Sequence, residues 1–531
     1  MAKLIINPDI DCNIYIDTEY YGEAKANTDF VININVGSYW VDCRCKEDDD
    51  ITYNCDINIT EESDNISVRA HILNYTLLVN LKENYDNVSI LCKNILLVKK
   101  SNRYGIINKS GKELISVKYE SIKLIGDTLL KLELNGRFGL ANLEGIKITP
   151  LKYLRIENAM NGIYALFFDC WQFVDSNAVK VDVPDNVLLY TTINDSVIKI
   201  ERTYSSWHVT YDTAFQHKPM YEECVNGHCI LIFKESVTVI GEKTFQYCNE
   251  LKSIQIPEKV SSIGKNAFSG CKNLSEFKGK FASNDGKCII IDNSLKAFAI
   301  GCGAVYYTLP SDLTSIDYGA FYNCNSIIDV TIPDSVTEIG ACAFHDCSNL
   351  TNINIPDSVT AIGYMAFEGC QKLANINIGN LITSIEKDAF CFCESLNNVT
   401  IPNNIQTIGN GAFYDCKSLT EIIIPDNVTS IGNDAFYGCS NLTSIHIGEC
   451  VKSIGKRAFR ACHELKEFYC KSIIPPKISC GNSAYFSGIF SDHISQFRIY
   501  VPSESVSYYK TQFGWSNYAN YIEGYPFISK R

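Results

Sequence analysis

The sequence LTEIIIPDNVTSIGNDAFYGC, residues 419–439, holds more apolar side chains than a segment of this length can bury alone. Ile422 and Ile424 are separated by one residue, the period that predicts a short strand with one buried face. Pro425 cannot donate a hydrogen bond to a strand ladder and therefore ends the strand, and Gly432 lets the chain turn before an Ala-Phe pair. Copies of such a unit must stack on one another to share their apolar residues.

The chain contains many copies of this unit at a step of 23 residues. From Phe321 the phenylalanine recurs at this step up to Phe459, and two earlier units carry Phe245 and Phe268. A cysteine follows each of these nine phenylalanines three positions later: Cys248, Cys271, Cys324, Cys347, Cys370, Cys393, Cys416, Cys439 and Cys462. The constant spacing predicts parallel strands stacked about 4.8 Å apart. We therefore predict a mainly β protein with a C-terminal solenoid.

The repeated pattern Leu-x-x-Ile-x-Ile-Pro-x-x-Val-x-x-Ile-Gly-x-x-Ala-Phe-x-x-Cys resembles the BspA-type leucine-rich repeat over residues 235–531. Members of that family are known or suspected surface binding proteins, so the resemblance implies a solenoid with a binding function. The step from Phe268 to Phe321 is 53 residues, which leaves room for an insertion at about 278–308. That insertion resembles the hairpin-like island that interrupts many arrays of this family.

The tail of the chain, including Gly514 and Trp515, resembles the closing segment of the same family. We expect it to cover the last repeat. Ser503 is predicted to begin a short helix that turns three side chains inward: Val506, Tyr509 and Phe513.

The N-terminal part carries a weaker repeat, in which Gly105 and Asn108 recur 34 residues later as Gly139 and Asn142. It resembles the WG repeat, with Tyr and Phe in place of the usual Trp, and predicts β-hairpins. The alternating strand patterns before it are similar to a PEGA domain, a small β-sandwich. An acidic loop at residues 47–50 has no EF-hand spacing, so we interpret it as a solvated turn and not as a cation site.

These patterns predict that the chain consists of five parts. They are a PEGA-like β-sandwich at 1–80, a WG-repeat-like β domain at 84–200, a connector and N-terminal cap at 201–234, the leucine-rich-repeat solenoid at 235–470 and a C-terminal cap at 471–531.

Charge and composition narrow the possible partners. The formal net charge of −13 and the lack of a Lys/Arg cluster argue against nucleic acid, because phosphate contacts need clustered cations. No apolar run reaches the roughly 18 residues of a membrane span, and the N-terminus lacks the apolar region of a secretory signal. We therefore predict no membrane insertion and a cytoplasmic monomer, with the cell surface as the alternative location.

Sequence motifs for catalysis and cofactor binding were not found. Cys224, His228 and Cys229 could donate three metal ligands, but their spacing fits no standard zinc site and adjacent strand residues point to opposite faces. We predict no cofactor, no metal and no catalytic residues. The alternative functions are a surface adhesin exported without a cleavable signal and an unrecognised enzyme in residues 1–230.

The nine repeat cysteines are predicted to be buried free thiols, stacked one above another as small apolar fillers. Disulfides between adjacent rungs are conceivable, because rungs about 4.8 Å apart lie within the Cα range of a bridge. An odd number of equivalent cysteines argues against that arrangement.

The outward positions of the repeat strands form the candidate binding surface. If alternate residues such as Ile422 face inward, residues such as Ile423 face outward on an exposed parallel sheet. Most outward positions are polar, but Ile423, His446 and Tyr469 form an apolar strip, and such strips with polar rims are typical of interaction sites. We predict that a protein or glycan ligand contacts Glu421, Ile423, Ser444, His446, Glu467 and Tyr469. The alternative is a solvated face on which Asn side chains form stabilising ladders.

Overall fold

The structure is a computed structural model of the 531-residue chain. It describes residues 2–8, 12–25, 28–35, 37–45, 52–59, 65–70, 81, 83–92, 95–126, 128–160, 162–177, 179–200, 202–204, 207–478, 488–490 and 497–527. The acidic loop at residues 47–50 lies outside the described residues. The chain divides into two compact units, residues 1–184 and 185–531, and the predicted mainly β fold is confirmed.

The first unit begins with two sheets. One has the order β4-β1-β7 and the other the order β3-β2-β5-β6. Apolar residues of both sheets share one core, among them Leu4 on β1, Ile14 on β2 and Val41 on β5. The seven strands are β1 (Ala2–Pro8), β2 (Cys12–Ile16), β3 (Glu19–Ala24), β4 (Phe30–Ile34), β5 (Gly37–Cys45), β6 (Thr52–Ile59) and β7 (Asn65–Ala70).

Three antiparallel sheets follow in the first unit. In each, an Asn or Asp side chain closes a turn by accepting backbone N–H bonds: Asn108 from Lys112, Asn142 from Ile146 and Asp175 from Val179. The third turn has Asp in place of Asn. The strands are β8 (Asn87–Cys92), β9 (Ile95–Lys100), β10 (Arg103–Asn108), β11 (Glu113–Tyr119), β12 (Ser121–Ile125), β13 (Leu129–Leu134), β14 (Arg137–Asn142), β15 (Arg155–Asn158), β16 (Tyr164–Phe167), β17 (Trp171–Val174) and β18 (Lys180–Val181).

The second unit starts with a cap that covers the first repeat. Strand β19 (Val187–Thr192) pairs antiparallel with β25 (Leu251–Ile256), the first long strand of the solenoid, and thereby covers an edge that would otherwise be open. On its other side β19 pairs with the hairpin strand β23. The remaining elements of the cap are β20 (Arg202–Tyr204), β21 (Trp207–Val209), α2 (Tyr211–Phe215), β22 (Tyr221–Val225) and β23 (His228–Ile232).

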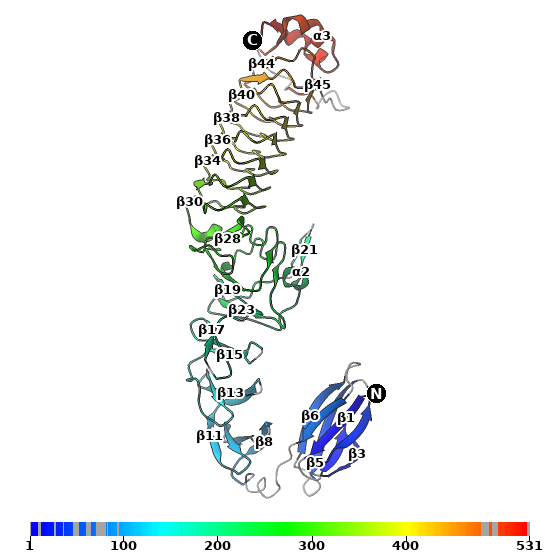
Figure 1. The fold of residues 1–531 in the computed structure, drawn as a ribbon, viewed down its shortest axis with the longest axis vertical. Coiled ribbons are helices and arrows are strands. Elements are labelled where there is room, and N and C mark those ends of the chain that lie inside the picture. Colours follow the sequence, from blue (N-terminus) through cyan, green and yellow to red (C-terminus); the bar gives the residue numbers. More distant parts are fainter. Residues whose placement is uncertain are drawn as a thin grey trace. The chain divides into compact units, whose positions relative to one another are not determined.

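Each solenoid repeat contributes one longer and one shorter strand, and equivalent strands stack in parallel ladders (Figure 1). The longer strands continue from β25 as β27 (Glu276–Gly279), β30 (Tyr306–Thr308), β32 (Asp329–Thr331), β34 (Asn352–Asn354), β36 (Asn375–Asn377), β38 (Asn398–Thr400), β40 (Glu421–Ile424), β42 (Ser444–Ile447) and β44 (Glu467–Cys470). The shorter strands are β24 (Val239–Ile240), β26 (Ser262–Ile263), β31 (Ser315–Ile316), β33 (Glu338–Ile339), β35 (Ala361–Ile362), β37 (Ser384–Ile385), β39 (Thr407–Ile408), β41 (Ser430–Ile431), β43 (Ser453–Ile454) and β45 (Lys477–Ile478).

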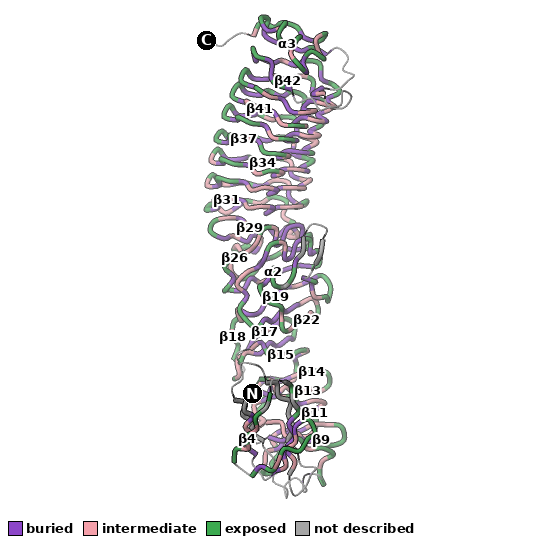
Figure 2. Tube along the Cα trace, turned by 90° about the vertical axis from the view of Figure 1, so that its right-hand side faces the viewer, coloured by how far each residue is buried: buried purple, intermediate pink, exposed green. Residues whose placement is uncertain are grey.

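The inserted segment forms a hairpin of β28 (Cys288–Ile291) and β29 (Ser294–Phe298), followed by a short 3-10 turn, η1 (Ile300–Cys302). Strand β29 pairs in parallel with β31, so one strand of the hairpin joins the ladder of the shorter strands. Each repeat of the solenoid has both buried and exposed segments (Figure 2), and in β40 buried and exposed residues alternate one by one.

The C-terminal segment adds two more strands to the ladder of longer strands, β46 (Arg498–Pro502) and β47 (Ile522–Tyr525). Between them lie η2 (Ser503–Ser505), α3 (Val506–Thr511) and η3 (Trp515–Tyr521). The predicted inward orientation is wrong for Phe513, which is 77% exposed, because the chain becomes extended at Gln512 where α3 ends. Trp515 is buried instead, and its Nε1 donates to the carbonyl of Pro476 at 2.8 Å.

Candidate binding surface

The strands β40, β42, β44, β46 and β47 form one parallel sheet at the C-terminal end of the solenoid. Their register places Ile423 beside His446, His446 beside Tyr469 and Tyr469 beside Tyr500. The residues between them, such as Ile422 and Ile445, are buried in the solenoid core, so the side chains of this row point outward.

Aromatic rings on this face contact one another in a continuous series. The His446 and Tyr469 rings stack with centroids 4.5 Å apart, and the Tyr469 and Tyr500 rings stack at 4.7 Å. The Tyr525 ring meets the Tyr469 ring edge-on at 5.3 Å and lies 5.0 Å from Phe527. We call His446, Tyr469, Tyr500, Tyr525 and Phe527 the aromatic cluster. It joins the predicted site on the repeat strands to the two strands of the cap.

Acidic side chains border the aromatic cluster. Glu421 and Glu467 are exposed on the same face, and Glu421 lies 3.4 Å from Nε2 of His446. Partial burial lowers the pKa of His446 against the opposing effect of Glu421, so the imidazole is mainly neutral at pH 7. Partial burial, reinforced by Glu467, raises the pKa of Tyr469 to about 12.

One cation interrupts this acidic border. Arg498 occupies the position next to Glu467 on the following strand, and its Nε lies 2.7 Å from a carboxylate oxygen of Glu523. Ser444 lies between Glu421 and Glu467 in the same row and is half-buried.

The structure thus brings all six predicted residues onto one face, and it adds residues that the sequence did not single out. Ile423 remains 60% exposed at one end of the aromatic series, and Tyr525 is 40% exposed at the other. Tyr500 and Tyr525 were missed because they lie beyond the last 23-residue step. The alternation in Arg498-Ile-Tyr-Val501, which matches Glu467-Phe-Tyr-Cys470, is the signal that points to Tyr500.

Comparison with known families agrees with this architecture. The model of the BspA type leucine rich repeat region matches six copies in residues 217–288, 292–402 and 383–499, which together make up more than half of the chain. The chain belongs to the BspA-type leucine-rich repeat family. A search of curated proteins found no match.

Several solved structures resemble parts of this BspA-type chain. A leucine-rich repeat protein from Bacteroides ovatus is 29% identical over 54% of this chain and 71% of its own, with a TM-score of 0.38. The T. pallidum leucine rich repeat protein is 30% identical over 35% of this chain and 86% of its own, with a TM-score of 0.31. A leucine rich cell surface protein from Faecalibacterium prausnitzii is 24% identical over 54% of this chain and 96% of its own, with a TM-score of 0.26.

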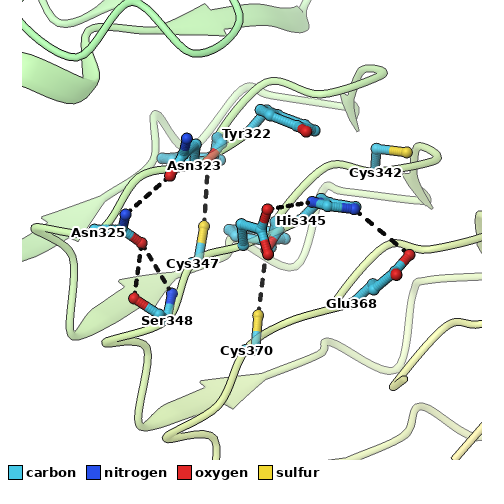
Figure 3. Close-up of polar contacts among 12 residues, drawn as sticks. Tyr322, Asn323, Asn325, Cys342, His345, Cys347, Ser348, Glu368 and Cys370 are labelled. Carbon is cyan, nitrogen blue, oxygen red and sulfur yellow. Dashed lines mark hydrogen bonds and ion pairs between the residues drawn. The ribbon is translucent and has the colours of Figure 1, made fainter. Parts of the chain in front are cut away.

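The nine repeat cysteines are all buried in the solenoid core, and all nine are thiols outside any disulfide. Seven of their thiols also donate to the carbonyl oxygen of the phenylalanine one rung earlier, for example Cys347 to Phe321 at 3.1 Å and Cys370 to Phe344 at 3.2 Å (Figure 3). Burial raises the pKa of Cys347 and Cys370 well above the ordinary thiol value. The ladder therefore has a structural role and little nucleophilic character at neutral pH.

A polar cluster next to the Ala-Phe pairs connects three successive repeats. His345 lies 3.2 Å from Asp346 and 3.5 Å from Glu368 on the next rung (Figure 3), and its ring stacks on Tyr322 of the preceding rung. The two carboxylates outweigh the opposing effect of burial and raise the pKa of His345 to about 9. The protonated His345 side chain therefore forms ion pairs that connect neighbouring repeats at neutral pH.

The possible metal ligands have other partners in the structure. Cys224 and Cys229 lie opposite each other on β22 and β23 and form a disulfide, so neither is available as a thiolate ligand. Within the described residues, no group of three or more His, Cys, Asp or Glu side chains could hold a metal ion.

Membrane-spanning helices are a separate question. Among the residues that the structure describes, no helix is both long and apolar enough to cross a bilayer.

Proposed function

We propose that this protein is a non-catalytic, monomeric binding protein and that its C-terminal face docks a protein partner. We define that face as Glu421, Ile423, Ser444, His446, Glu467 and Tyr469 together with Arg498, Tyr500, Glu523 and Tyr525. The observation that carries the proposal is the exposed Ile423 side chain next to the aromatic cluster, on a sheet whose other outward positions are mostly polar. Exposed apolar patches with a polar rim and many aromatic residues are typical of protein interfaces.

The geometry of the rings favours a protein over a glycan at this face. His446 and Tyr500 cover the two faces of the Tyr469 ring, whereas a sugar ring needs an open aromatic face on which to pack. What remains accessible is the Ile423 side chain, the ring edges and the hydroxyl groups. These features suit the side chains of a protein surface.

The charges on the C-terminal face define the partner further. Glu421, Glu467 and Glu523 carry three negative charges, and Arg498 carries the one positive charge among the residues that define the face. A partner with Lys or Arg around an apolar centre would therefore be complementary to it. Such charge pairs mainly speed association and select the partner, while burial of the apolar centre holds the complex together.

The proposal also covers the role of the N-terminal unit and the cellular location of the protein. The resemblances of residues 1–80 to a PEGA domain and of 84–200 to WG repeats support the role of these modules as further interaction surfaces. The description of one relative as a cell surface protein and the Cys224–Cys229 disulfide favour the surface, whereas the many solenoid cysteines outside any disulfide suit the cytoplasm. Fractionation of native cells, with detection of this protein inside or outside, separates the two locations.

Site-specific photocrosslinking tests the docking surface. A photoreactive residue replaces Ile423 in one variant and Leu381, an apolar residue that is 53% exposed outside the C-terminal face, in a matched control. Exposure of both variants to native cell extract should give a discrete protein adduct from position 423 and none from position 381. Equal adduct patterns from both positions would remove the C-terminal face from the proposal.

A further inference from the structure

A second candidate site lies on another sheet of the solenoid, β30-β32-β34-β36-β38, nearer the N-terminal end. Outward side chains of β32, β34 and β36 line a shallow depression of about 280 Å³. Its polar side chains are the carboxylate of Asp329, the hydroxyl of Thr331 and four amides: Asn352, Asn354, Asn375 and Asn377. The strand register sets them in two rows, with successive members on adjacent strands.

These amides remain available for a ligand. Asn375 accepts one bond from Asn398 at 3.3 Å and Asn352 donates one to Thr351 at 3.4 Å, both near the long limit for hydrogen bonds. Asn354 and Asn377 make no side-chain hydrogen bond within the described residues. Each amide carries N–H donors and a carbonyl acceptor, and the lining contains no Lys, Arg or His. The depression therefore suits a neutral ligand rich in hydroxyl groups better than a phosphate or a sulfate.

Tyr306 adds an aromatic platform to one side of the depression. It lies on β30, the end strand of this sheet, and its backbone is paired with Asp329 on β32. The side chain is 73% exposed and has no ring partner among the described residues. Tyr306 thus differs from Tyr469, whose ring is stacked on both faces.

An open aromatic ring beside amide and carboxylate groups matches the chemistry of a sugar. A pyranose ring has an apolar face of C–H groups that packs on an aromatic ring, and its hydroxyl groups both donate and accept hydrogen bonds. We propose that Tyr306 and the amide-lined depression form a binding site for a neutral oligosaccharide. One sugar ring packs on Tyr306, and the next exchanges hydrogen bonds with Asp329, Asn352 and Asn354.

Calorimetric titration of the full chain with neutral oligosaccharides tests this site. The probes are α- and β-linked oligomers of glucose, mannose and N-acetylglucosamine, together with one sulfated oligosaccharide. At least one neutral probe should bind, and Tyr306→Ala should weaken its binding by about tenfold, which corresponds to ~1.4 kcal/mol. Tyr306→Phe should retain most of the affinity, and Asn354→Ala should reduce it.

Two control variants show whether the sugar binds at Tyr306 or elsewhere on the solenoid. Tyr364→Ala removes a tyrosine that is 44% exposed outside the depression and should leave sugar binding unchanged. Substitution of Ile423, His446 and Tyr469 should also leave it unchanged, because the sugar site does not depend on the C-terminal face. Absence of binding by every neutral probe, binding of the sulfated probe alone, or full affinity in Tyr306→Ala would overturn the proposal.

Discussion

Replacement of Cys416 tests how the cysteine ladder stabilises the solenoid. The Cys416 side chain is fully buried, and its thiol donates to the carbonyl of Phe390 at 3.2 Å. Cys416→Ala removes the sulfur, leaves a small void and deletes one weak hydrogen bond, for an expected loss of about 1–2 kcal/mol in the free energy of unfolding. Cys416→Ser keeps a donor but buries a more polar group in an apolar site, so we expect a loss of about 2–3 kcal/mol.

The assay is urea unfolding followed by circular dichroism, with the exposed Cys450→Ala as the control. The control should change the free energy of unfolding by less than about 0.5 kcal/mol. If Cys416→Ser were as stable as the unaltered protein, the hydrogen bond and not apolar packing would be the main contribution of the thiol. If Cys416→Ala matched the Cys450→Ala control, the ladder would contribute nothing measurable and the reasoning would be refuted.

Three further predictions concern reactivity, pH and the cap. The exposed Cys170 and Cys450 should react with a thiol reagent in the native state, whereas the ladder cysteines should react only on unfolding, as mass spectrometry would show. Because the pKa of His345 rises from 6.5 to about 9 on folding, its stabilising effect should be complete below about pH 6.5 and disappear as the pH passes 9. Unfolding experiments at several pH values should show this dependence in the unaltered protein and not in His345→Gln. Trp515→Ala should lower the melting temperature by several degrees, and Phe513→Ser should leave it nearly unchanged, because only Trp515 is buried.

The repeat period explains why the solenoid could be predicted from the sequence. A fixed offset between Phe and Cys, as in Phe436 and Cys439, places every copy in the same environment, so the burial of one cysteine predicts the burial of all. The thiol hydrogen bonds could not be predicted in this way. They connect a cysteine to a carbonyl on the preceding rung, and that contact depends on the three-dimensional offset between rungs.

The two ends of the solenoid were harder to predict because they break the period. Strand β19 runs antiparallel to the array and carries no repeat pattern, so the sequence does not show that it covers the first repeat. At the other end, Tyr500 and Tyr525 reach the exposed face through cap strands at irregular spacing. Phe513 follows the apolar spacing of a longer helix, but α3 ends at Thr511 before reaching it.

Tyr469 also changes what is expected of variants at the C-terminal face. The sequence alone predicts that replacing Ile423, His446 and Tyr469 with Asn, Thr and Thr leaves the fold nearly unaltered. The Tyr469 ring, however, contacts the rings of His446, Tyr500 and Tyr525, so the triple variant should lose about 1–2 kcal/mol of stability while the solenoid stays folded.

The affinity of the crosslinked partner for that triple variant tests the proposed function most directly. The dissociation constant is measured for the unaltered protein, for the triple variant and for the control Leu381→Asn, each shown to be folded by circular dichroism. We predict that the triple variant binds the partner at least about a hundredfold more weakly, as expected for loss of an apolar interface centre worth ~2.7 kcal/mol, and that Leu381→Asn binds normally. Equal affinity of the triple variant and the unaltered protein would contradict the assignment of the C-terminal face as the binding site.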